Sequence, residues 1–239
     1  MACRTGDVDS QPFPRRGALA DRLNLSADDL REALSPSCAI VYCYIIATVE
    51  QRDDRFIQRG SGPNFQGGRI SLCTCKHLMR TYKDPCDWEG AWIAGFTGVA
   101  AGRGSNALVY LMRVDHAFDS HAALWASGAI PTAVKRAKAA HRHPLGDIFE
   151  PKDAPGDPYR PRSYIPPHRD HVHRPHGGWH GDIDYVGPGG RRAALLFGGA
   201  ATSFLWETPL LYHPVRLHRG QRKTDLATLR GQLTAEGPR

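Results

Sequence analysis

The chain has 239 residues, of which 41% are hydrophobic and 23% charged, so it can build a core and is not a disordered chain. Its 31 Lys and Arg outnumber 24 Asp and Glu to give a net charge of +7, which favours a polyanionic partner such as nucleic acid. No apolar run approaches the roughly 20 residues of a membrane span, and six cysteines in so long a chain do not indicate a disulfide scaffold. We expect a cytoplasmic protein without a membrane partner.

The N-terminal part of the sequence predicts a leader, a helix and a central strand. Residues 1–17 are polar and lack the apolar core of a signal peptide, so we expect a loose leader. Residues 18–34 have a helical apolar pattern, in which Ser26 and Asp29 are spaced as a capping box. Residues 39–48 carry β-branched and aromatic side chains on both faces, which is typical of a strand covered on both sides.

The middle of the chain predicts a loop, a short helix and a β-hairpin. Residues 50–69 are polar and rich in glycine, and we expect an exposed loop there. Residues 71–82 carry apolar side chains at helical spacing and predict a short helix. Residues 88–97 and 107–114 are typical of strands, and the glycine-rich segment between them favours a hairpin.

The last part of the chain alternates between regular elements and a long irregular segment. Residues 120–126 and 132–140 predict helices, 193–206 a strand and 226–233 a terminal helix. Residues 144–192 are rich in Pro, Gly and His, yet they retain tyrosines and a tryptophan that disordered segments usually lack. We therefore expect this segment to form a long structured loop over a site.

Together these elements predict an α+β fold, with residues 18–239 as a single domain. We expect a mixed, mostly antiparallel sheet flanked by helices. The strand, glycine turn and strand around Trp92 and Tyr110 also resemble the small PUA-like barrels that bind modified bases. A small barrel is therefore the alternative to an open sheet.

Short motifs follow one another in order along residues 39–206. They are Pro63-Asn64, Leu72-Cys73-Thr74-Cys75-Lys76, Arg80, Trp92-Ile93-Ala94-Gly95, the strand 108–114, Gly156-Asp157-Pro158-Tyr159, and His180 with Asp182. In this order they resemble the second nucleotide modification associated domain family. The chain departs from that family at two places. It has Gly90-Ala91 where the family has Gly-Asp, and Phe204-Leu205-Trp206-Glu207 where the family has Phe-Tyr-Phe-Gly. The resemblance implies a role in nucleic-acid modification and fixes no reaction.

A set of planar and cationic side chains within these motifs predicts a nucleotide pocket. Aromatic rings stack on bases, an amide reads a base edge and cations bind phosphate. The candidates are Asn64, Lys76, Arg80, Trp92, Tyr110 and Tyr159. The alternative for Trp92 and Tyr110 is an ordinary place in the core of neighbouring strands.

His180 and Asp182 are the candidate catalytic pair, as a general base and the carboxylate that orients it. They lie in a segment that also contains His168, His171, His173 and His176. Histidine and carboxylate side chains are metal ligands, but no established zinc spacing occurs; we name no metal-ligating residue and leave metal binding by this segment open. The residues do not identify a cofactor.

Cys75 is either a structural or a reactive thiol. Within the predicted helix 71–82 it would take a place in the core beside Leu72 and Met79. If Cys75 and Lys76 both face a cleft, the ammonium group favours the thiolate.

The sequence therefore predicts a protein that binds nucleic acid or a nucleotide in connection with base modification and receives a base in an aromatic and basic pocket. The alternative is a transferase or hydrolase that acts on a nucleobase or nucleotide through His180 and Asp182, with or without a metal. A third possibility is an adaptor whose histidine-rich loop docks a base-modification enzyme.

Overall fold

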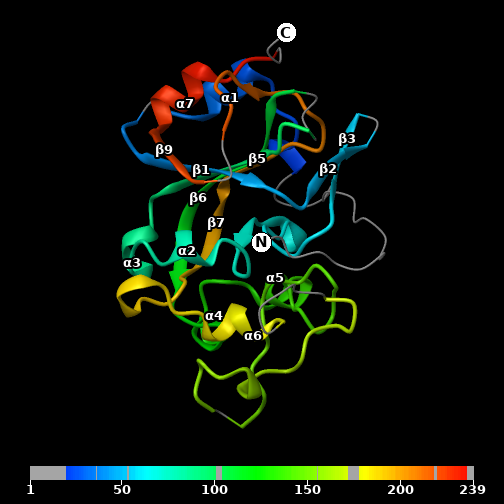
Figure 1. Ribbon diagram of the computed structural model, residues 1–239, viewed down its shortest axis with the longest axis vertical. Coiled ribbons are helices and arrows are strands. Elements are labelled where there is room, and N and C mark those ends of the chain that lie inside the picture. Colours follow the sequence, from blue (N-terminus) through cyan, green and yellow to red (C-terminus); the bar gives the residue numbers. More distant parts are fainter. Residues whose placement is uncertain are drawn as a thin grey trace. The chain divides into compact units, whose positions relative to one another are not determined.

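The computed structural model (Figure 1) describes residues 20–35, 37–52, 54–100, 104–154, 156–171, 178–217 and 220–235. The chain divides into two compact units. Unit 1 contains residues 59–89 and 115–198, and unit 2 contains residues 20–58, 90–114 and 199–235 of the described part. The predicted leader 1–17 lies outside the described residues, as do His173 and His176.

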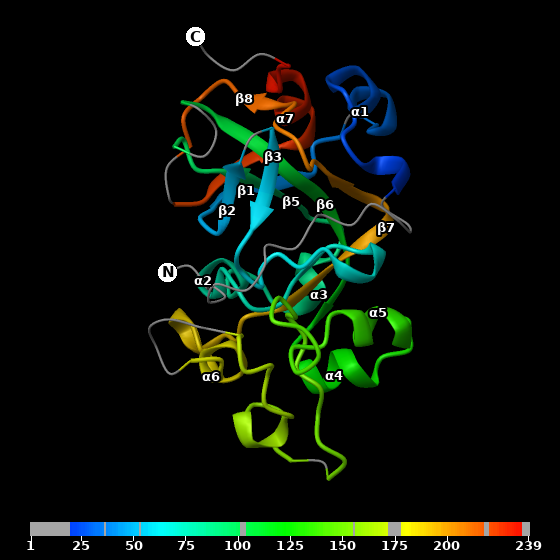
Figure 2. The same cartoon turned by 90° about the vertical axis from the view of Figure 1, so that its right-hand side faces the viewer.

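The fold is α+β with a mostly antiparallel sheet, as predicted. Its strands are β1 (Ile40–Ile46), β4 (Ser71–Leu72), β5 (Trp92–Thr97), β6 (Asn106–Phe118), β7 (Leu195–Leu205), β8 (Tyr212–His213) and β9 (Arg222–Asp225). The strand order is β4-β7-β6-β5-β1-β9, and β8 pairs with β6. Strands β1 and β5 pair parallel, whereas the pairs β1–β9, β4–β7, β5–β6 and β6–β8 are antiparallel. Figures 1 and 2 show β6 and β7 as long neighbouring strands. The described strands do not close into a barrel, and likeness to PUA domains stays a prediction.

Strand β1 is an interior strand of the sheet, next to the edge strand β9. It pairs with β5 on one side and β9 on the other, and every residue of it except Ile40 is buried, so the predicted doubly covered strand is confirmed. The predicted hairpin is confirmed as well, since β5 and β6 pair antiparallel with Gly95 opposite Tyr110. A side chain at Gly95 would collide with the Tyr110 ring, so this position requires glycine.

The expected exposed loop at residues 50–69 is wrong. The chain instead forms the antiparallel hairpin of β2 (Val49–Arg52) and β3 (Arg55–Gln58), and residues 60–65 are buried. Gly62 in this segment allows the backbone to pack closely against Cys75. A Cβ at Gly62 would lie 2.8 Å from Cys75 Sγ.

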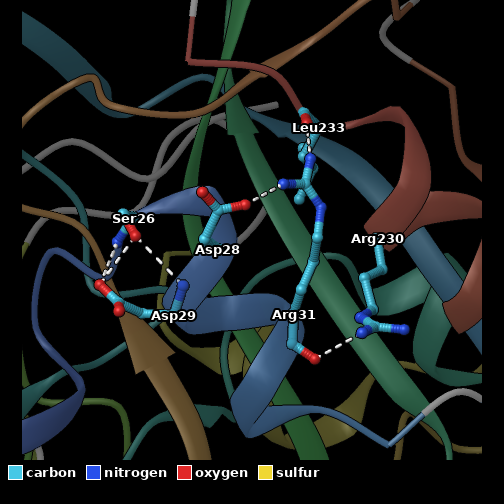
Figure 3. Close-up of polar contacts among 6 residues, drawn as sticks. All are labelled: Ser26, Asp28, Asp29, Arg31, Arg230 and Leu233. Atoms are coloured by element: carbon cyan, nitrogen blue, oxygen red, sulfur yellow. Dashed lines mark hydrogen bonds and ion pairs between the residues drawn. The ribbon is translucent and has the colours of Figure 1, made fainter.

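Two helices of unit 2 lie side by side at its surface (Figure 3). They are α1 (Ala27–Ala33) and α7 (Leu226–Gln232), and the latter also packs against β1 and β9. Arg31 Nη2 donates to the Leu233 carbonyl (3.3 Å), and Arg230 Nη2 donates to the Arg31 carbonyl (2.6 Å). The predicted capping box is confirmed, because Ser26 Oγ accepts from Asp29 N (3.1 Å) while the Asp29 carboxylate accepts from Ser26 N (3.3 Å). The predicted helix 18–34 is shorter, with a 3-10 turn at Ala20–Arg22 before α1.

Unit 1 consists of short helices joined by irregular segments. They are α2 (His77–Arg80), α3 (Pro85–Trp88), α4 (His121–Ala126), α5 (Thr132–Ala137) and α6 (His180–Asp184), with 3-10 turns at Gln66–Gly68, Pro161–Ser163 and Pro188–Gly190. The predicted helix 71–82 is only half right, because Ser71 and Leu72 form β4 and Cys75 precedes α2. The apolar spacing misled because β4 and α2 are each too short to show a period of their own. In the described part, no helix has the length and apolar character that crossing a membrane demands.

A buried polar network ties the loop before β4 to the end of α5. Lys138 is fully buried, and its Nζ donates to the Asn64 carbonyl (3.0 Å) and to Asn64 Oδ1 (2.8 Å). Asp147, also fully buried, accepts hydrogen bonds from Ser71 Oγ and from Cys73 N. Burial lowers the pKa of Lys138 to about 8 and raises the pKa of Asp147. These buried groups are already hydrogen-bonded within unit 1, so we assign them a role in the stability of that unit.

We expect Ser26→Ala to destabilise the chain by about 1 kcal/mol, because the first turn of α1 loses its capping acceptor. Urea unfolding at neutral pH measures the effect. The matched control is Glu32→Ala on the exposed side of the same helix, which should change the free energy of unfolding by less than about 0.5 kcal/mol. Equal effects of the two substitutions would contradict a stabilising cap.

Candidate active site

The contact between His77 and Asp182 is the centre of the candidate site in unit 1. His77 Nε2 lies 2.7 Å from Asp182 Oδ1, although the two residues are far apart in the sequence. The Asp182 side chain is completely buried, whereas 24% of the His77 side chain is exposed. The Tyr185 ring packs on the imidazole with 5.0 Å between ring centroids. A partly exposed imidazole held by a buried carboxylate is an arrangement suited to proton transfer.

Helix α6 positions Asp182. Its neighbour Ile183 is buried in an apolar cluster with Phe149 and Tyr164. Trp179, which precedes the helix, stacks on Phe149 with 5.3 Å between ring centroids and accepts a hydrogen bond from Asp182 N at its carbonyl (3.1 Å). These contacts anchor both ends of the helix segment, so the carboxylate has a fixed place.

Arg80 is the fixed cation behind the pair. It is fully buried; its Nε donates to the Cys75 carbonyl (2.8 Å) and its Nη1 donates to the Ala194 carbonyl (2.7 Å). Among the described residues, no hydrogen-bond acceptor contacts Arg80 Nη2. Burial lowers the pKa of Arg80, while the negative charge of groups that include Asp182 and Cys75 raises it. The guanidinium therefore supplies positive potential to this part of unit 1.

His121 is a second, fully buried histidine at the site. It begins α4 behind the capping residue Ser120, and its ring packs edge-on against Phe149 with 4.9 Å between centroids. Phe149 N donates to Nδ1 (3.2 Å), so the neutral ring carries its proton on Nε2. Burial lowers the pKa of His121 to about 3, and Asp182 opposes that effect. His121 is thus neutral and adds no charge beside Asp182.

A small pocket borders Asp182. His121, Asp182 and Tyr185 line it together with Asp119 and Arg192. In the part of the chain that the structure describes, Arg192 Nη1 is buried without a hydrogen-bond partner. The pocket thus combines carboxylate acceptors with an N–H donor, and its volume of about 10 Å³ is that of roughly one water molecule.

Tyr159 contacts two residues that line this pocket, Arg192 and Asp119. The Arg192 guanidinium lies 3.8 Å from the Tyr159 ring centroid, and the Tyr159 hydroxyl donates to Asp119 Oδ2 (3.1 Å). The Gly-Asp-Pro-Tyr motif shapes this segment, since Asp157 Oδ1 accepts from Tyr159 N (2.9 Å). Tyr159, predicted from sequence to contact a base, therefore lies next to a residue that lines the pocket.

Two other predicted site residues, His180 and Asn64, do not join the contact between His77 and Asp182. His180 is exposed on α6 and packs against Trp179, and the histidine in contact with Asp182 is His77. Asn64 is fully buried, and its side chain bonds Lys138 and the Leu145 carbonyl.

The two predicted stacking aromatics belong to unit 2. Trp92 is 6% exposed, and Tyr110 is fully buried with its hydroxyl 2.9 Å from that of Tyr44. The burial of Tyr110 fits the alternative that it is an ordinary core residue of the sheet and does not stack on a base. Lys76 and Arg80 belong to unit 1, where Lys76 is half-buried directly beside His77.

Sequence reasoning did not select His77, His121 or Arg192. His77 had one usable signal, its place directly after Cys75 and Lys76 in a family-like motif. His121 and Arg192 had none, because burial and ring contacts between distant segments leave no local pattern. In the described part of the chain, no group of three His, Cys, Asp or Glu side chains is arranged to hold a metal ion.

No protein-family model, curated protein or solved structure matches the chain in the comparisons with known proteins.

His121 should make the stability of the protein sensitive to acid. Its pKa is about 3 in the folded chain and 6.5 ordinarily, so stability is complete above pH 6.5 and is lost as pH falls towards 3. We expect His121→Asn, which keeps an acceptor for Phe149 N, to flatten the fall in the free energy of unfolding between about pH 6.5 and 4. A proton that binds to the unfolded chain but not to the folded one changes the free energy of unfolding by about 1.4 kcal/mol per pH unit.

Urea unfolding at a series of pH values measures this slope. The control is His116→Asn, a half-exposed histidine of the same unit, which should keep the slope of the unsubstituted chain. Parallel curves for His121→Asn and the unsubstituted chain would contradict a buried neutral His121.

Proposed function

We propose that the chain is an enzyme that performs acid–base chemistry on a nucleobase or nucleotide. His77 is the group that transfers the proton, and Asp182 is its positioning residue. The observation that carries the proposal is the 2.7 Å contact between a partly exposed imidazole and a fully buried carboxylate. This assignment keeps Asp182 from the sequence-based pair and replaces His180 by His77.

The geometry supports a defined role for each nitrogen of His77. Nε2 faces Asp182, so the carboxylate orients the ring and stabilises the imidazolium that forms on proton uptake. Exchange with a substrate then takes place at Nδ1. Arg80, buried behind Asp182, favours the ionised carboxylate.

Three features support a nucleotide as the substrate class. The order of motifs resembles a family linked to nucleic-acid modification, and the net charge of +7 suits a polyanion. Beside this pocket Arg192 lies 3.8 Å from the Tyr159 ring centroid, and a cation and a ring are the kinds of group that bind phosphate and base. Base binding without chemistry has less support, because Asn64 and Tyr110 are fully buried and already hydrogen-bonded.

A substitution at His77 tests the proposal. The unsubstituted chain is incubated with nucleosides, nucleotides and oligonucleotides, plain and base-modified, at about 0.15 M salt. Products are identified as nucleosides by mass spectrometry. We expect His77→Gln, which keeps an N–H near Asp182, to lower turnover by about 10²- to 10⁴-fold without loss of stability.

Two further variants make the outcome decisive. His116→Gln is the matched control and should keep full turnover. Loss of turnover in His180→Gln instead of His77→Gln would return the role of base to His180. Binding of an oligonucleotide by the unsubstituted chain with no product from any substrate would overturn the enzyme and leave a base-binding protein.

A further inference from the structure

The pocket that borders Asp182 is lined by three segments of unit 1. They are the start of α4, the helix α6 and the residues that lead into β7. Apolar side chains such as Ile183 and Leu195 form part of its lining, whereas His121, Asp182 and Arg192 contribute polar groups. A pocket of about 10 Å³ has room for roughly one water molecule. The polar groups around it therefore decide what it binds.

His121 gives this pocket a buried hydrogen-bond donor. Phe149 N donates to Nδ1 (3.2 Å), so the proton of the neutral ring is on Nε2. The residue is only 2% exposed, and no described residue offers Nε2 an acceptor in hydrogen-bond geometry. The Asp182 main chain lies close enough to raise the pKa of His121, but not in that geometry. A buried N–H group without an acceptor is rare in proteins and indicates a bound water or ion.

Arg192 supplies a second donor to the same pocket. Its Nη1 is buried, and within the described ranges of the chain this atom has no hydrogen-bond partner. The guanidinium lies 3.8 Å from the Tyr159 ring centroid, and the Tyr159 hydroxyl donates to Asp119 Oδ2 (3.1 Å), so the side chain has a fixed place. Two N–H donors from segments far apart in the sequence therefore border one water-sized pocket.

The charges around the pocket select the ligand. Asp119 and Asp182 both line it, and their carboxylates repel an anion. A metal ion requires lone pairs, whereas His121 and Arg192 present N–H groups to the pocket. Water satisfies both kinds of group, because it accepts hydrogen bonds from N–H donors and donates its own protons to carboxylates. Size and charge thus indicate the same ligand.

We infer that the pocket binds one ordered water molecule, which accepts hydrogen bonds from His121 Nε2 and Arg192 Nη1 and donates one to the Asp182 carboxylate. Three protein partners are typical of a buried water. The water connects α4, α6 and the segment before β7, and it positions the carboxylate that contacts His77. The inference goes beyond the proposed function, because it holds whether or not His77 transfers a proton.

A high-resolution crystal structure of the full chain tests this site without any substrate. We expect a solvent peak within about 3.2 Å of His121 Nε2, of Arg192 Nη1 and of an Asp182 carboxylate oxygen. A second crystal, soaked in sodium bromide, distinguishes water from an anion, because bromide scatters anomalously and water does not. We expect no anomalous peak in the pocket.

A variant links the water to its donors. Arg192→Met keeps an unbranched side chain and removes the Nη1 donor, so we expect the solvent peak to be lost. The control Arg162→Met removes an exposed arginine of the same unit and should keep the peak. If Arg192→Met does not fold, the two crystals of the unsubstituted chain still decide the question.

Each result decides between the two proposals. An empty pocket, an acceptor of the chain itself at His121 Nε2, or an anomalous bromide peak overturns the water site. An unchanged peak in Arg192→Met overturns the set of donors that we assign to it. Turnover that depends on His77 would in all of these cases still support the proposed function. Conversely, a water at these three atoms in a chain without turnover would support the site and overturn only the enzyme.

Discussion

The candidate site depends on one buried cation. Arg80 joins its own segment to one far away in the sequence, because its Nε reaches the Cys75 carbonyl and its Nη1 reaches the carbonyls of Ala193 and Ala194 just before β7. A guanidinium without solvent is costly unless such acceptors and a counter-charge compensate it. Asp182 supplies negative charge nearby, so the same interaction that stabilises Arg80 favours an ionised carboxylate beside His77. Removal of Arg80 would leave main-chain carbonyls unpaired and Asp182 without this cation.

The surroundings of Asp182 divide the two histidines into different roles. His121 is enclosed by aromatic rings and stays neutral, so it shapes the site without competing for the proton. His77 contacts the same carboxylate and keeps a route to solvent. Burial therefore separates a structural histidine from one that can exchange protons, although both are ordinary histidines in the sequence.

Unit 1 builds this site from segments with little regular structure. Its helices are one or two turns long, and their places are fixed by buried side chains such as Ile183 and by the network of Lys138 and Asp147. Cooperative helix formation contributes little at such lengths. The rigidity of the site thus comes from tertiary hydrogen bonds and packing, and single substitutions in these contacts should act on the site as a whole.

The sequence by itself determined four of the seven strands of the sheet and little of the site. Long apolar runs predicted β1, β5, β6 and β7 correctly, and Ser26 with Asp29 predicted the start of α1, because strand alternation and capping are local properties. The segment 50–69 was wrong, since glycine there permits burial against Cys75 instead of exposure. The sequence selected Asp182 as a candidate, but it did not predict the contact of Asp182 with His77. That pair, the burial of Asn64 and the neutral state of His121 were decided only by the tertiary structure, because each depends on which distant segments exclude water from it.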